Sequence, residues 1–76
     1  MIRCTVETAW VLLDGMYAAD VVWRYPGEWS DVSGQTDAQI PTNPNGAIFV
    51  GRVDPAVFAQ IAADPAITVI SSETEG

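Results

Sequence analysis

Residues 47–71, AIFVGRVDPAVFAQIAADPAITVIS, contain the pattern that decides the expected fold. Residues 47–53 are apolar or glycine at every position but one, and they follow the turn-forming Pro44-Asn45-Gly46, which predicts a strand. Residues 66–70 are rich in β-branched side chains and predict a second strand. The stretch therefore predicts a strand, a connecting helix and another strand.

The connection between these strands has clear helix signals. Asp54 suits the N-cap, Pro55 suits the first helical position, and Asp64-Pro65 ends the helix because a residue before proline avoids helical torsion angles. The apolar side chains of Val57, Phe58 and Ile61 recur on one helical face. About a dozen residues are enough for a parallel crossover, so we expect a parallel pair of strands covered by one helix. An antiparallel return is the open alternative.

The N-terminal residues predict a β-hairpin. Residues 2–8 alternate between apolar and polar side chains, which places Cys4 and Val6 on an inner face. Asp14-Gly15 is a two-residue turn signal, and a hairpin around it pairs Val6 with Trp23 and Thr5 with Arg24. We interpret Cys4 as a small core residue, because the chain has no histidine to activate it as a nucleophile.

These elements predict one α+β domain over residues 1–76, with a small mixed sheet of about four strands and one short helix packed on one face. Its expected parts are a hairpin at 1–25, a long loop at 26–46, the β-α-β unit at 47–71 and a polar tail at 72–76. A loop of this length is usually functional, disordered or ordered by a partner, and it has room for a short strand near residues 29–33.

Composition makes several functions improbable. The net charge is −7, from three arginines, no lysine and ten acidic residues, which disfavours contact with nucleic-acid phosphates or an anionic membrane. A single cysteine and no histidine leave no internal disulfide and no ordinary zinc site. We therefore expect no enzyme activity, no cofactor and no small-molecule substrate. Without a signal peptide or an apolar span, we expect a cytoplasmic protein or one in a particle assembled there.

One loop pattern resembles the first half of a calcium-binding loop. Asp31, Ser33, Gln35 and Asp37 stand at alternate positions, as early calcium ligands do. The glycine expected at the sixth position is Thr36, and the glutamate expected at the twelfth is Thr42. We therefore predict a polar turn-rich loop and no metal site.

The aromatic residues and one strand suggest a protein interface. The strand at 47–53 is apolar on both faces, and a single helix covers only one of them. The first hairpin with the long loop, or another chain, must cover Ile48 and Val50. Trp10 and Trp29 are the aromatics least needed inside, and aromatics are enriched at interface centres. The candidate protein interface is therefore Trp10, Trp29, Ile48 and Val50.

Both ends of the chain resemble a group of viral proteins. The resemblance covers about half of the sequence and is carried by Arg3-Cys4-Thr5-Val6-Glu7-Thr8, Trp10-Val11, Val53-Asp54-Pro55, Phe58, Ile61, Ala63-Asp64-Pro65 and Val69-Ile70. These segments are similar to small acidic proteins encoded near the tail or head genes of tailed bacteriophages. The resemblance implies a virion or assembly protein, located in the virion or the host cytoplasm, that binds its own copies or virion proteins.

Two functions follow as hypotheses. The first is a non-enzymatic structural or accessory protein that joins other chains through strand edges and aromatic side chains. The alternative is an acidic inhibitor that covers a basic nucleic-acid-binding surface of a host protein, with Glu28, Asp31 and Asp37 as its contacts.

Overall fold

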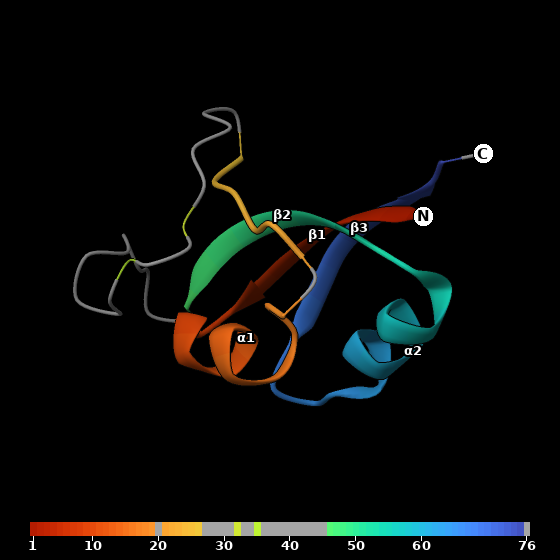
Figure 1. The fold of residues 1–76 in the computed structure, drawn as a ribbon. Helices are drawn as coiled ribbons and strands as arrows, with labels where there is room; N and C mark the ends of the chain where they lie inside the picture. Colours follow the sequence, from red (N-terminus) through yellow and green to blue (C-terminus); the bar gives the residue numbers. More distant parts are fainter. Residues whose placement is uncertain (20, 27–31, 33–34, 36–45, 76) are drawn as a thin grey trace.

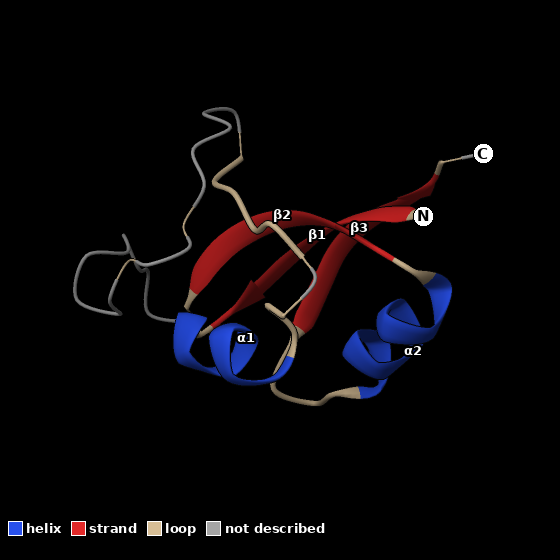
Figure 2. Cartoon of the chain, in the orientation of Figure 1, coloured by secondary structure: helices blue, strands red, loops and turns tan. Residues whose placement is uncertain are grey.

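The computed structural model of the chain describes residues 1–19, 21–26, 32, 35 and 46–75. In order, the elements are β1 (Ile2–Thr8), α1 (Trp10–Met16), β2 (Ala47–Val53), α2 (Pro55–Ala63) and β3 (Thr68–Thr74). The strands form one antiparallel sheet in the order β2-β1-β3, and both helices pack on the same face of it (Figures 1 and 2). The expected α+β class is confirmed, with three strands and two helices in place of about four strands and one helix.

The predicted N-terminal hairpin is wrong, because Asp14-Gly15 lies in the last turn of α1. Trp10, Leu13 and Tyr17 are buried at helical spacing, and the Tyr17 N–H donates to the Leu13 carbonyl at 2.8 Å. This apolar face against the sheet outweighs the local turn signal, and glycine is well tolerated near a helix C-terminus.

The predicted pairing of Arg24 with Thr5 is also wrong. Arg24 instead bridges Val50 on the outer edge of β2, with hydrogen bonds of 2.9 Å from Arg24 N–H to Val50 O and 2.7 Å from Val50 N–H to Arg24 O. The fourth strand was expected beside residues 2–8; instead, among the described residues, this single bridge beside β2 is all that the second half of the predicted hairpin adds to the sheet. Trp23 does point inward, as expected, and it is fully buried.

The β-α-β unit is present, but its strands are not neighbours. β2 and β3 both pair antiparallel with β1, so they run in the same direction with β1 between them. The prediction of an adjacent parallel pair is therefore wrong, and the antiparallel return does not occur either. Cys4, Val6 and Thr8 are all buried on the inner face of β1, where the Thr8 hydroxyl donates to the Ala66 carbonyl at 3.0 Å. This burial suits the central position of the strand.

Helix α2 begins and ends where the sequence predicts. The Asp54 side chain accepts a hydrogen bond from the Val57 N–H at 2.9 Å, and Pro55 follows in the first turn. Asp64 is the C-cap, and its carboxylate accepts a hydrogen bond from the Ala66 N–H at 2.9 Å. Ile61 is fully buried and attaches the helix to the core.

The C-terminal boundary differs from the prediction. β3 extends to Thr74, whereas residues 72–76 were expected to form a fraying polar tail. Backbone pairing continues to the end of the described chain, where the Glu75 N–H donates to the Met1 carbonyl at 2.9 Å. Polar side chains suit this strand because both β3 faces are largely exposed. Of the predicted loop at 26–46, only Pro26, Val32, Gln35 and Gly46 are among the described residues. The short strand expected near residues 29–33 lies outside them except for Val32.

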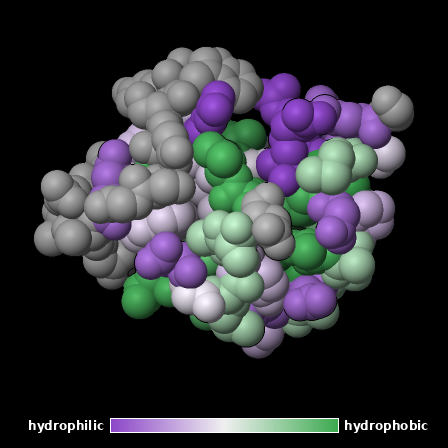
Figure 3. Space-filling view, viewed as in Figure 1, coloured by the Kyte–Doolittle hydropathy of each residue, from purple (hydrophilic) through white to green (hydrophobic). Residues whose placement is uncertain are grey.

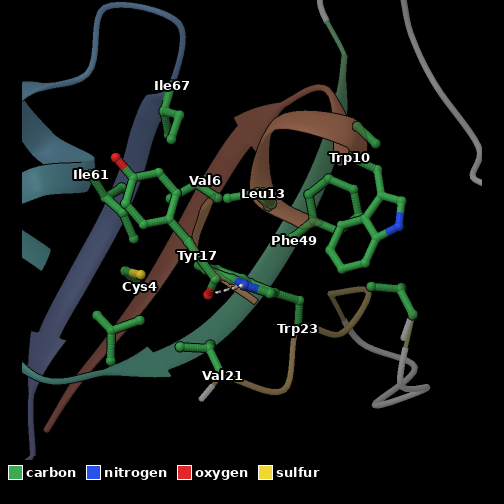
Figure 4. Close-up of a cluster of buried hydrophobic side chains, with 13 residues drawn as sticks. Cys4, Val6, Trp10, Leu13, Tyr17, Val21, Trp23, Phe49, Ile61 and Ile67 are labelled. Carbon is green, nitrogen blue, oxygen red and sulfur yellow. Dashed lines mark hydrogen bonds between the residues drawn. The ribbon is translucent and has the colours of Figure 1, made fainter. Parts of the chain in front are cut away.

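Aromatic side chains dominate the core between the sheet and α1. The Trp10 and Phe49 rings lie 5.3 Å apart, and the indole N–H of Trp23 donates to the Tyr17 carbonyl at 3.3 Å (Figure 4). Trp23 lies directly over Gly51, where a Cβ would come within 2.6 Å of the indole. The close approach of Trp23 therefore requires glycine at this position.

Candidate functional site

The structure places the four candidate interface residues in different environments. Trp10 is 3% exposed and belongs to the core, where its indole N–H donates to the Gln35 carbonyl at 3.2 Å. The prediction that Trp10 is not needed inside is therefore wrong, because residues 10–16 form a helix whose apolar face meets Phe49. Ile48 is half-buried and Val50 is 9% exposed. Trp29 lies outside the described residues, as do Glu28, Asp31 and Asp37 of the alternative acidic surface.

The sheet face opposite the helices, which we call the outer face, is largely polar. Alternation along the three strands places nine side chains on it: Arg3, Thr5, Glu7, Ile48, Val50, Arg52, Thr68, Ser71 and Glu73. The sequence left open what covers Ile48 and Val50 on this face. For Val50, the bridge to Arg24 places residues 22–24 beside it. For Ile48, the described residues do not answer the question.

A cavity of about 570 Å³ lies between residues 22–24 and the ends of β1 and β2. Its lining includes Arg3, Arg24 and Arg52, which are the only basic side chains in the sequence. Val22, Val50 and Glu75 also line it. Strongly hydrophilic side chains gather, beside apolar ones, at the end of the molecule where both termini lie (Figure 3). We call the cavity lined by Arg3, Arg24 and Arg52 the arginine cavity.

Strand register explains how three arginines distant in sequence meet. Arg3 of β1 is directly opposite Arg52 of β2, and Arg24 is paired with Val50, two residues before Arg52. Paired residues on neighbouring strands share a face, so all three side chains project from the outer face. Among the described residues that line the cavity, Glu75 supplies the one carboxylate, and it pairs with Arg52 at 2.7 Å.

Sequence reasoning missed the arginine cavity. The alternating pattern already puts Arg3 on the outer face of its strand and Arg52 on the same side of its own strand as Ile48 and Val50. That signal becomes informative only when β2 and β1 are known to be neighbours, and the hairpin prediction placed Arg24 beside the wrong strand.

Two titratable side chains of the core, Cys4 and Tyr17, have raised pKa values. Burial raises the pKa of the Cys4 thiol to about 11, which keeps it protonated and unreactive at neutral pH. Burial, followed by the charge and hydrogen bond of Asp64, raises the pKa of Tyr17. Cys4 is confirmed as a core residue, at 1% exposure.

The described residues contain no cluster of three or more histidine, cysteine or acidic side chains that could hold a metal ion. Of the calcium-like pattern, only Gln35 is among them. Across the same part of the chain, every helix is too short or too polar to cross a membrane. Comparison with protein-family models, curated proteins and solved structures found no match to this chain.

Proposed function

We propose that this chain is a small non-enzymatic protein that acts by binding other protein chains, as a component of a bacteriophage virion or of its assembly. The protein-binding part of the proposal is supported by the exposure of β3. The virion part rests on the resemblance of the two chain ends to proteins encoded near virion genes.

β3 has the properties of a strand that can accept another strand. Within the described part of the chain it pairs only with β1, so no strand described there pairs with the backbone N–H and C=O groups of its second edge. Six of its seven residues are exposed. An extended segment from another chain adds to such an edge through backbone hydrogen bonds, while side chains on alternate positions supply specificity.

Ile70 supplies an apolar contact at this edge. The register shifts between Thr5, which pairs with Ser71, and Val6, which pairs with Val69, so Ile70 is the extra residue of a β-bulge. Its side chain is 52% exposed. An exposed isoleucine in a polar strand is a natural centre for a small interface, where apolar groups are desolvated on binding.

The proposal is tested by measuring self-association and attachment to particles. Ile70→Lys places a charge at the β3 edge, whereas Val11→Lys makes the same chemical change on α1, at a side chain that is 66% exposed. We expect light scattering to show concentration-dependent assembly, or virions to retain the chain, for the wild type and Val11→Lys but not for Ile70→Lys. A chain that stays monomeric and never copurifies with virions would refute the proposal, as would equal behaviour of the two variants.

The alternative, inhibition of a basic nucleic-acid-binding surface, is less well supported on the outer face. All three arginines project from that face, and they would repel a basic partner. Complex formation with a nucleic-acid-binding protein that weakens steeply with added salt would favour this alternative over strand addition.

A further inference from the structure

We propose that the arginine cavity binds a compact ligand carrying two or more oxyanion groups, either carboxylates or phosphates. This site lies over β1 and β2 and includes Glu75, the residue that follows β3. It does not use the outer edge of β3, so it can be tested independently of the proposed strand addition.

The first argument is the arrangement of charge. Ten acidic residues are available to three arginines in this sequence, yet Arg3 and Arg52 are directly opposite each other on neighbouring strands. Like charges in that position destabilise a sheet. Adding Arg24 to the same cavity increases the repulsion. Glu73 lies opposite Arg3 on β3 and Glu75 pairs with Arg52, so among the described residues three guanidinium groups meet two carboxylates at this end of the outer face. A multiply charged anion would balance the remaining positive charge.

The second argument is an oxyanion already bound within the chain. Arg52 Nε donates to one carboxylate oxygen of Glu75 at 3.1 Å, and Arg52 Nη2 lies 2.7 Å from the other. This two-point contact is the geometry in which a guanidinium recognises carboxylate or phosphate. Because the Arg52 side chain is 63% exposed, the pair is weak enough for a ligand to displace it.

The third argument is the size and lining of the cavity. Its volume of about 570 Å³ is large enough for a small molecule, and the cavity is half open to solvent. Val22 and Val50 supply an apolar wall next to the guanidinium groups, which suits an anion with a short carbon skeleton. An extended peptide fits less well, because the Arg24 bridge already occupies the adjoining edge of β2 at Val50.

Isothermal titration calorimetry with citrate, pyrophosphate and a hexaglutamate peptide tests this proposal at low salt. We expect saturable binding of citrate or pyrophosphate to the wild type with a Kd below about 1 mM, a weak affinity typical of a few polar contacts. Tighter binding of citrate identifies carboxylates as the preferred groups, and tighter binding of pyrophosphate identifies phosphates.

The decisive variants are Arg24→Gln and Arg52→Gln, compared with Gln60→Glu. All three lower the net charge by one, but Gln60 is exposed on α2, away from the cavity. Each arginine variant should weaken binding about 10- to 100-fold, the loss expected for a charge-assisted hydrogen bond, while Gln60→Glu should change it less than threefold. Arg24→Lys keeps the charge and should still weaken binding, because lysine lacks the planar fork.

Several results would overturn the proposal. They are the absence of saturable binding of both small anions at 5 mM, equal losses in the arginine variants and Gln60→Glu, or binding of hexaglutamate alone. Circular dichroism of each variant establishes that it is folded. If an arginine variant is unfolded, shifts of the arginine Nε–H resonances of the wild-type protein on anion addition decide the question instead.

Discussion

Replacement of Gly51 by alanine should destabilise the protein through one steric contact. The new Cβ would lie 2.6 Å from Trp23 Cε3 and 2.7 Å from Cζ3, well inside contact distance. Trp23 cannot move easily, because it is fully buried and its indole N–H is hydrogen-bonded to Tyr17. Gly51 is held as well, since it pairs with Cys4 and adjoins the Val50 bridge. We expect a loss of about 1–3 kcal/mol, as for other overpacked cores.

Gly15→Ala is the matched control, with an effect of opposite sign. Nothing lies within 4 Å of a Cβ at Gly15, which is in α1, and alanine is favoured over glycine inside a helix by about 0.5–1 kcal/mol. In the hairpin that the sequence predicts, Gly15 would need a positive φ and alanine would destabilise it. The sign of this one change therefore distinguishes helix from turn.

Urea denaturation followed by tryptophan fluorescence, with thermal melting by circular dichroism, measures both effects. In a domain of this size each kcal/mol corresponds to about 4–8 °C in Tm. A Gly51→Ala protein with wild-type stability would refute the reasoning about Trp23. If that variant does not fold, the cost is measured in a Trp23→Phe background. A smaller ring should reduce the cost of the alanine, and a coupling below about 0.5 kcal/mol would contradict direct contact.

Three further changes have defined outcomes. Stability should be full below pH 9 and fall as the pH rises towards 11, because the unfolded chain loses the Cys4 proton near the ordinary pKa of 9.0 while burial holds the folded pKa at about 11. A shift of two pKa units corresponds to about 2–3 kcal/mol of the free energy of unfolding. In Cys4→Ala, the free energy of unfolding measured in urea should change less between pH 9 and 11. The same decrease in the variant as in the wild type would contradict the role given to Cys4. Asp54→Ala should lower the free energy of unfolding measured in urea by about 1 kcal/mol, because it removes the hydrogen bond that caps the Val57 N–H. Asp54→Asn should keep most of the wild-type stability, because asparagine can also accept that hydrogen bond. Arg52→Gln should cost less than about 1 kcal/mol, because its pair with Glu75 is exposed, and a larger loss in the same assay would indicate a structural role for the pair.

Local signals were sufficient for α2 and insufficient for α1. Asp54, Pro55 and the Asp64-Pro65 pair determine the limits of α2 through backbone chemistry that acts within a few residues. In α1 the Asp14-Gly15 signal is equally local, but burial of Trp10 and Leu13 against the sheet decides the outcome. That contact depends on Phe49, which is distant in sequence and enters no local pattern.

Strand order was the larger obstacle to finding the candidate site. Alternation correctly places Cys4 and Val6 inside and Arg3 outside, because a strand has only two faces. It contains no information about which strand lies beside which. The opposition of Arg3 and Arg52 exists only because β1 lies next to β2, so the arginine cavity could not be read from spacing alone.

The central position of β1 has a consequence for how the chain acquires its fold. Every strand pairing joins distant residues, from Thr8 with Ala47 to Ile2 with Thr74, so none can form early as a local hairpin. Loop closure must precede these contacts, and such topologies fold slowly for their size. Of the three strands, β1 is synthesised first and β3 last. Residues 2–8 therefore lack one of their two neighbouring strands until β3 has been synthesised. We therefore expect the sheet to form in one late, cooperative step.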